Sequence, residues 1–244
     1  MSELKYWNPD SGKNFGDALS ETIVDFLKPN GSVLTANMLA VGSIMPNMLE
    51  DNIHVWGSGV HPKLVNLKHE AKKNVVFHAV RGPLTEQWLN RNGYEVKTTH
   101  GDPGLLTSLF IKPSYVKPTG KPIFVSHIFD GLDEATEWYG IEIVHAIKPL
   151  QYVVDKIVNA SIVYSSSLHG LILADAYKKP SAIIQSLTEG DFKYGDYYYS
   201  TGRYLPEFYK TPTDNITPMM TQNTLESIQK ALLKSFPTQI FKEQ

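Results

Sequence analysis

The fold is decided by residues 160–180, which read ASIVYSSSLHGLILADAYKKP. The β-branched and aromatic run at 162–164 is typical of a buried strand. Three serines then offer caps for a helix, and two lysines followed by Pro180 are typical of a helix end. Residues 181–184, which read SAII, can form the next parallel strand. The stretch therefore predicts a strand–helix–strand unit of an α/β protein.

A histidine in the first turn of this predicted helix is unusual. His169 lies among serine hydroxyls and the unpaired backbone N–H groups of a helix start, where the positive end of the helix dipole favours an anion. The same dipole disfavours an imidazolium ion. We therefore expect His169 to exchange a proton near neutral pH.

The composition excludes several classes of protein and of functional site. The chain has 244 residues, a formal net charge of -2 and no cysteine. The charge gives no reason to expect nucleic acid as a partner. The lack of cysteine excludes disulfides, thiolate metal sites and a cysteine nucleophile. The first residues lack the apolar core of a signal peptide, and no run approaches the ~18 apolar residues of a membrane span. We therefore expect a cytoplasmic protein without a transmembrane segment.

The order of segments predicts two α/β halves. Residues 38–44, 53–59 and 74–80 are typical of strands that end in glycine turns or, in the last case, in Arg81. Residues 112–122 contain three prolines and no apolar periodicity, as in a linker. We predict a first domain at 1–117, a second at 118–220, and a C-terminal helix within 221–244 that packs back on the first domain.

Three segments contain candidate ligand contacts. An arginine at the carboxyl end of a strand suits a carboxylate or phosphate, although Arg81 could equally cap a surface turn. Residues 7–17 are either a simple entry turn or a pocket wall, and Asp17 or Ser20 could cap the helix that follows. Residues 190–203 are dense in tyrosine and charge, which is typical of a binding wall, although the tyrosines at 194–199 could instead simply pack a loop.

Several specific motifs are missing. The sequence has no P-loop, no Gly-x-Ser-x-Gly elbow, no His-Glu-x-x-His and no Asp-x-Asp. Its eight histidines do not show the close spacing of a zinc site. What remains is a set of anion-binding elements, with no metal and no resident cofactor expected.

Six segments resemble, in order, the polysaccharide pyruvyl transferase family, and particularly its short exopolysaccharide-biosynthesis branch. They are NFGD at 14–17, VWGSG at 55–59, VRGPLT at 80–85, GDPGLL at 101–106, SSSLHGLILADAY at 165–177 and DFKYGDYY at 191–198. The resemblance implies two Rossmann-like halves arranged as in GT-B glycosyltransferases, with the active site in the cleft between them. It also implies transfer of the enolpyruvyl-derived unit of phosphoenolpyruvate to sugar hydroxyls of a surface or capsular polysaccharide precursor, which gives a pyruvate ketal.

The resemblance also assigns roles to residues. The family's essential histidine corresponds to His169, and its donor-binding arginine to Arg81. Many members have an arginine two positions before that histidine, where this chain has Ser167, so Lys193 or Arg203 would have to replace it. The full expectation is as follows: catalysis by His169, Asp17 and Asp102; donor binding by Arg81, Ser165, Ser166, Ser167, Leu168, Lys193 and Arg203; acceptor binding by Asn14, Tyr194, Tyr197 and Tyr198.

Two other functions fit the same fold. One is a GT-B glycosyltransferase that uses a nucleotide-sugar, and the other is a non-catalytic glycan-binding protein. In each case the partner is a glycan or lipid-linked saccharide, and a lipid-linked acceptor would bring the protein to the inner membrane leaflet.

Overall fold

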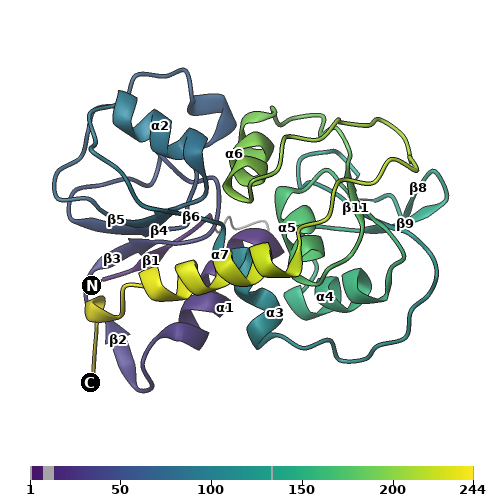
Figure 1. Cartoon of the computed structure of the whole chain (residues 1–244), viewed down its shortest axis with the longest axis horizontal. Coiled ribbons are helices and arrows are strands. Elements are labelled where there is room, and N and C mark those ends of the chain that lie inside the picture. The colour runs from purple at the N-terminus through teal and green to yellow at the C-terminus, as the bar shows by residue number, and fades with distance from the viewer. Residues whose placement is uncertain (1, 8–13, 133, 244) are drawn as a thin grey trace.

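The computed structural model describes residues 2–7, 14–132 and 134–243, and it contains two five-stranded sheets (Figure 1). All neighbouring strands of the first sheet are parallel, in the order β1-β3-β4-β5-β6. Its strands are β1 (Leu4–Lys5), β3 (Asn37–Leu39), β4 (Ile53–Trp56), β5 (Val76–Val80) and β6 (Thr99–His100). The predicted α/β class is thus confirmed for this half.

The second sheet has the order β11-β10-β7-β9-β8 and is parallel except at β8. Its strands are β7 (Ile123–Val125), β8 (Glu137–Trp138), β9 (Ile141–Val144), β10 (Val163–Ser165) and β11 (Ser181–Ile183). Helix α5 (Leu168–Ala176) connects β10 to β11, so the strand–helix–strand unit predicted from residues 160–184 is present.

The remaining elements cover these sheets and connect them. The helices are α1 (Phe15–Leu27), α2 (Pro83–Arg91), α3 (Thr107–Phe110), α4 (Leu150–Asn159), α6 (Phe192–Ser200) and α7 (Gln222–Ser235). The short 3-10 helices are η1 (Pro62–Leu64), η2 (Pro103–Leu106) and η3 (Thr238–Ile240). Strands β2 (Ser32–Leu34) and β12 (Phe241–Glu243) form a separate antiparallel pair.

Helix α1 joins the two halves through a shared core. Asn14 caps it by accepting a hydrogen bond from the N–H of Gly16, so the cap is neither of the two predicted residues, Asp17 and Ser20. Leu19 of α1 is fully buried in the same apolar cluster as Val125 of β7 and Ile172 of α5. Because this cluster draws on both sheets, apolar burial stabilises the way the halves are packed together.

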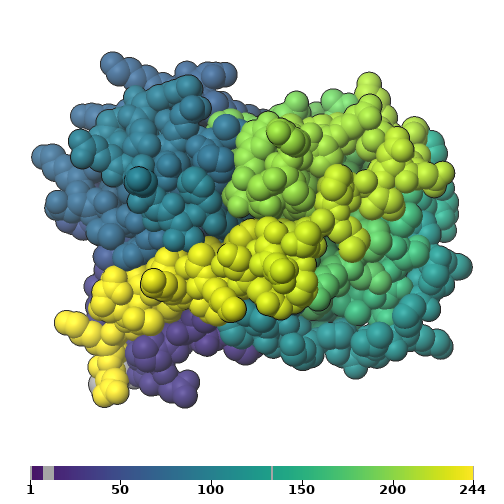
Figure 2. All heavy atoms as spheres, in the orientation of Figure 1, coloured from purple at the N-terminus to yellow at the C-terminus, as the bar shows by residue number. Residues whose placement is uncertain are grey.

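The C-terminal helix crosses the first half. The indole N–H of Trp56 donates to the carbonyl of Leu232 at 3.2 Å, and the side-chain amide of Gln229 donates to the carbonyl of Leu105 at 2.8 Å. Figure 2 shows the C-terminal part of the chain, in yellow, running across the front of the molecule from the first half toward the second. Strand β12 follows α7 and pairs with β2, so the end of the chain returns to its N-terminal region.

The predicted linker is an extended segment held against α4. The N–H of Ser114 donates to the Asp155 carboxylate at 2.7 Å, and the N–H of Thr119 donates to the carbonyl of Asn159 at 2.9 Å. These bonds fix the path from α3 to β7. Within the described residues no helix has the length and apolar character needed to cross a membrane.

Candidate active site

A hollow of about 200 Å³ is lined by residues from both halves. The first half contributes polar residues from the start of α1 and from the loops after β3 and β4, and the second contributes the loops after β7 and β11 and the starts of α5 and α6. The polar lining residues are Asn14, Asp17, Ser43, Asn47, His61, His127, Ser167, His169, Glu189 and Lys193. Several of these loops follow the carboxyl ends of parallel strands, which is where open α/β sheets bind ligands.

His169 lies deep in this pocket, in the first turn of α5. Burial lowers the pKa of its imidazole to about 3, and the positive charges of Lys193 and Arg81 act in the same direction. The expectation that His169 titrates near neutral pH is therefore wrong for the unliganded protein. The ring is a neutral base at physiological pH, because burial adds to the helix-dipole effect considered from sequence.

Both predicted catalytic aspartates have raised pKa values, but only the pKa of Asp17 reaches neutral pH, so Asp102 is mostly ionised there. Burial raises the pKa of Asp17 to about 7, Lys193 opposes that rise, and the charge of Asp102 adds to it. Burial also raises the pKa of Asp102 to about 6, against the lowering effects of a hydrogen bond from Gly104 and of Arg81. The proton available to a ligand at neutral pH is therefore on a carboxyl group and not on the imidazole.

The serine turn before α5 is only partly open to the pocket. Ser165 accepts a hydrogen bond from the N–H of Ser167 at 3.0 Å and lies 3.0 Å from the carbonyl of Val125. Ser166 donates to the buried Asp130 carboxylate at 2.5 Å. Ser167 is the N-cap residue of α5 without a side-chain capping bond, and it lines the pocket together with Leu168. Ser165 and Ser166 thus shape the turn, and Ser167 is the serine that a ligand can reach.

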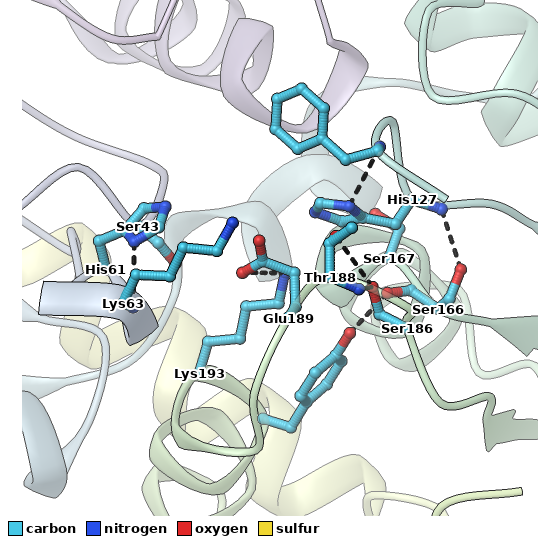
Figure 3. A network of polar contacts seen from close by, with 12 residues as sticks. Ser43, His61, Lys63, His127, Ser166, Ser167, Ser186, Thr188, Glu189 and Lys193 are labelled. Atoms are coloured by element: carbon cyan, nitrogen blue, oxygen red, sulfur yellow. Dashed lines mark hydrogen bonds and ion pairs between the residues drawn. The ribbon is translucent and has the colours of Figure 1, made fainter. Parts of the chain in front are cut away.

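Lys193 is a predicted donor-binding cation that does reach the pocket. Its ammonium lies 3.2 Å from the Glu189 carboxylate, and both side chains are almost fully buried. In Figure 3 this pair lies between His61 and Ser43 of the first half and His127 of the second. Burial and the Lys193 charge lower the pKa of His127 to about 4.

Sequence reasoning did not assign Ser43, His61 or Glu189 to the site. One signal was available for two of them. His61 follows the glycine turn after β4, and Glu189 follows β11, so both lie beyond the carboxyl ends of parallel strands. Residues 8–13, in the loop that the sequence predicts as either an entry turn or a pocket wall, lie outside the described residues. Trp7 and Asn14, on either side of them, line the pocket.

Arg81 matches neither of its two sequence interpretations. Its side chain is 1% exposed and does not line the pocket, because its guanidinium is used inside the protein. Nε donates to Asp196 at 2.9 Å, Nη1 donates to Ser43 at 2.6 Å, and Nη2 donates to the carbonyl of Val60 at 3.3 Å. Arg81 therefore joins β5 to α6 and positions Ser43, which does line the pocket.

Arg203 is also engaged elsewhere. Its guanidinium forms two hydrogen bonds with Asp175, at 3.0 and 2.5 Å, and lies 4.5 Å from the ring centre of Tyr198. The proposal that Arg203 replaces the missing arginine at Ser167 therefore does not fit this structure.

The predicted acceptor wall is part of the core. Tyr194, Tyr197 and Tyr198 have no exposed surface, since they lie on the inner face of α6. Tyr194 donates to the carbonyl of Ser166 and Tyr197 donates to Asp175 at 2.6 Å. These tyrosines cannot stack on a sugar, and their role is to fix α6 and the serine turn.

The residues described show no group of three or more histidine, aspartate or glutamate side chains placed to hold a metal ion.

Comparison with known proteins identifies the family. The sequence model of the polysaccharide pyruvyl transferase family matches residues 14–186, more than half of the chain. The chain therefore belongs to this family of transferases, which confirms the resemblance. It is 26% identical over 211 residues to the succinoglycan biosynthesis protein ExoV of Rhizobium meliloti strain 1021, across 81% of this chain and 64% of that protein. The chain thus spans less than two thirds of the length of this curated relative. No solved structure matches the chain.

Proposed function

We propose that the protein transfers the enolpyruvyl-derived unit of phosphoenolpyruvate to hydroxyls of a surface polysaccharide precursor, forming a pyruvate ketal. The observation that carries this proposal is the pocket in which Lys193, the start of α5 and His169 converge. The two sheets would then correspond to the halves of a GT-B-like arrangement with the active site between them. Membership of the pyruvyl transferase family and similarity to a succinoglycan biosynthesis protein support a glycan as the acceptor.

The pocket offers a lysine, which is paired with Glu189, and several hydrogen-bond donors to a small, highly anionic substrate. Phosphoenolpyruvate carries a carboxylate and a phosphate. Lys193 supplies a buried cation, and the backbone N–H groups at the start of α5 supply hydrogen-bond donors at the positive end of a helix dipole. His61 and His127 add imidazole N–H groups from opposite halves. These groups compensate for the serine at position 167, with Lys193 in place of the absent arginine.

The titration order suggests how the proton steps are divided. Asp17, with a pKa of about 7, protonates the donor methylene carbon, and an acceptor hydroxyl attacks C2. Neutral His169 takes the proton of that hydroxyl, and the Asp102 carboxylate stabilises the resulting imidazolium. The bond from C2 to the phosphate oxygen then breaks, and phosphate leaves with the proton held by His169. A second hydroxyl attacks C2 to close the ketal and gives its proton to Asp17. The scheme needs no metal.

Donor binding has an expected electrostatic signature. A bound phosphoenolpyruvate places negative charge beside His169, which favours the imidazolium and raises the pKa of the ring above its value of about 3. Titration of the His169 imidazole by NMR, with and without phosphoenolpyruvate, measures this change. An unchanged titration curve under saturating donor would contradict the proposed donor position.

The decisive assay is acceptor-dependent release of phosphate from phosphoenolpyruvate. Lys193→Met should weaken donor binding at least tenfold, because it removes the buried cation of the pocket. Lys156→Met is a matched control, since Lys156 also pairs with a glutamate, Glu142, but lies on α4 outside the pocket.

Stabilisation by a nucleoside diphosphate and not by phosphoenolpyruvate would instead support a nucleotide-sugar transferase. Saccharide binding without donor binding would support a non-catalytic glycan-binding protein.

A further inference from the structure

The burial of the α6 tyrosines leaves the acceptor without its expected binding surface. Apart from histidines, the described residues that line the pocket include two aromatic residues, Trp7 and Phe129. Their ring centres are 5.9 Å apart and their planes lie at 77°, an edge-to-face pair. Trp7 precedes α1 and Phe129 follows β7, so the pair brings together the two halves at the pocket wall.

The Phe129 ring is exposed although its backbone is held in place. Phe129 is 54% exposed. Its N–H donates to Nδ1 of His127 at 3.3 Å. The next residue, Asp130, is buried and accepts hydrogen bonds from Ser166 and Ser186 at 2.5 and 2.8 Å. An apolar ring on an anchored loop beside a polar pocket is suited to packing against a ligand.

A second hollow, of about 450 Å³, adjoins the first. Asn47 and Met48 line both, and the second is otherwise lined by residues 3–6, Leu49 and Glu50. Its side chains include the Lys5–Glu50 ion pair, whose atoms are 2.6 Å apart. The first hollow therefore has aromatic rings in its wall, and the second hollow has amide, ammonium and carboxylate groups.

This sequence of surfaces matches the chemistry of a carbohydrate chain. One face of a pyranose ring presents C–H groups that pack on an aromatic ring, and its hydroxyls need hydrogen-bond partners at the edge. Amides and carboxylates such as those of Asn47 and Glu50 supply such partners. A monosaccharide would occupy the aromatic pair alone, whereas the second hollow gives room for further residues.

We infer that Trp7 and Phe129 bind the terminal sugar ring of an oligosaccharide acceptor, whose next residues pass over Asn47 and Met48 into the second hollow. The inference rests on the proposed function and specifies its acceptor as a chain of at least two sugars. In this inference the acceptor binds to Trp7 and Phe129 and not to the buried tyrosines of α6.

The test uses binding of uncharged oligosaccharides, measured separately from phosphoenolpyruvate. The probes are β-linked gluco- and galacto-oligosaccharides of one to four residues, with affinity measured by saturation-transfer NMR and calorimetry. We expect wild-type affinity to rise at least tenfold from one residue to three. Phe129→Ala and Trp7→Ala should each lower trisaccharide affinity at least tenfold and leave phosphoenolpyruvate affinity within twofold of wild type.

Phe26→Ala is the matched control, because Phe26 is also 54% exposed and packs against an aromatic ring, that of Phe110, outside the pocket. It should bind every probe as wild type does. Unchanged trisaccharide affinity in Phe129→Ala, or affinity that does not depend on chain length, overturns the inference while phosphoenolpyruvate binding still supports the proposed function. If the wild-type protein did not bind phosphoenolpyruvate, the proposed function would be wrong. The saccharide measurements would still show whether Trp7 and Phe129 bind a sugar.

Discussion

Nε2 of His169 and Oδ2 of Asp102 face each other at 3.9 Å, and within the described structure both atoms are buried without a hydrogen-bond partner. A buried polar atom without a partner costs about 1–3 kcal/mol. The two atoms would satisfy each other after a movement of about 1 Å, with Nε2–H as donor, since hydrogen bonds of this type are about 2.7–2.9 Å long. Asp102 is therefore placed to stabilise a proton that His169 takes up.

Asp102→Asn tests this relationship without removing the local fold. Oδ1 of Asp102 accepts from the N–H of Gly104 at 2.8 Å, and the asparagine carbonyl can keep that bond. The substitution removes the negative charge opposite His169, so we expect transfer to slow by about 10²-fold or more. We expect the variant to be more stable than wild type at neutral pH, because asparagine avoids the cost of ionising a buried carboxyl group whose pKa is raised to about 6. Phosphate-release kinetics and thermal unfolding measure the two effects. A variant with wild-type rates would show that Asp102 does not assist His169.

Asp17→Asn should stabilise the protein, and more at high pH than at low pH. The pKa of about 7 in the folded protein lies above the ordinary aspartate value of 3.8, so the folded state holds a proton that the unfolded state releases. Stability is therefore lost as pH rises through this window, by up to roughly 4 kcal/mol above pH 7. Asparagine cannot ionise and avoids this cost.

The measurement is the difference in free energy of unfolding between variant and wild type at pH 5 and at pH 8. We expect the difference to grow by a few kcal/mol toward pH 8, while transfer activity falls. Asp25→Asn is the control, because Asp25 lies on the same helix but pairs with Lys28 at the surface. A pH-independent difference for Asp17→Asn would mean that its carboxyl is not buried in solution as it is in this structure.

The strand–helix–strand unit could be predicted from sequence because its signals are local. The wrong assignment of the α6 tyrosines could also have been avoided. The strand at 163–165 and the helix that follows are specified by β-branched residues, serines and a lysine–proline stop within 21 residues. The tyrosines of α6 also carried a readable signal. Tyr194, Tyr197 and Tyr198 are spaced i, i+3, i+4, as on one helix face, and Tyr199, off that face, is 42% exposed. This spacing favours a buried helix over a binding wall.

Other features depend on contacts that no local pattern shows. The partner of Arg81 is Asp196, 115 positions along the chain, so sequence alone could not show that the guanidinium was already bound. The same holds for the low pKa of His169, which results mainly from burial by elements of both halves. The Trp7–Phe129 pair likewise arises from two loops in separate halves. Patterns thus located His169, Asp17 and Lys193, and long-range packing determined which of the other candidates reach the pocket.

Arg81→Met should destabilise the protein by about 3–5 kcal/mol. Its ion pair with Asp196 is completely buried, and removing one partner leaves an uncompensated charge inside the protein. Asp196 also accepts from Thr85 at 2.9 and 2.6 Å, so those bonds hold the orphaned carboxylate in place. Urea unfolding measures the loss, and the double variant Arg81→Met with Asp196→Asn should recover part of it.

The control is Lys28→Ala, at the exposed Lys28–Asp25 pair, which should change stability by less than ~1 kcal/mol. Equal effects of Arg81→Met and Lys28→Ala would exclude a structural role for the buried pair.

Gly16→Ala should inactivate the protein at a position where helix propensity alone predicts a gain. Gly16 lies in the first turn of α1, and alanine is favoured over glycine in helices by about 1 kcal/mol. A Cβ atom there would lie 2.1 Å from Nδ1 of His169 and 2.8 Å from the Cβ of His169. Because the Cβ of His169 is fixed by the backbone of α5, rotation of the ring cannot relieve both contacts, and α1 and α5 must separate.

We expect Gly16→Ala to lower the melting temperature by several degrees and the transfer rate by at least 10²-fold, since a displacement of about 1 Å at a catalytic group has such effects. Gly195→Ala is the matched control. It is also a helical glycine, but its Cβ would meet Leu84 and Tyr199 at an ordinary 3.5 Å, so the substitution should be neutral or slightly stabilising. If Gly16→Ala were instead as stable and active as Gly195→Ala, the close contact between the start of α1 and His169 would not exist in solution. In that case the contact between α1 and α5 would not be what positions His169.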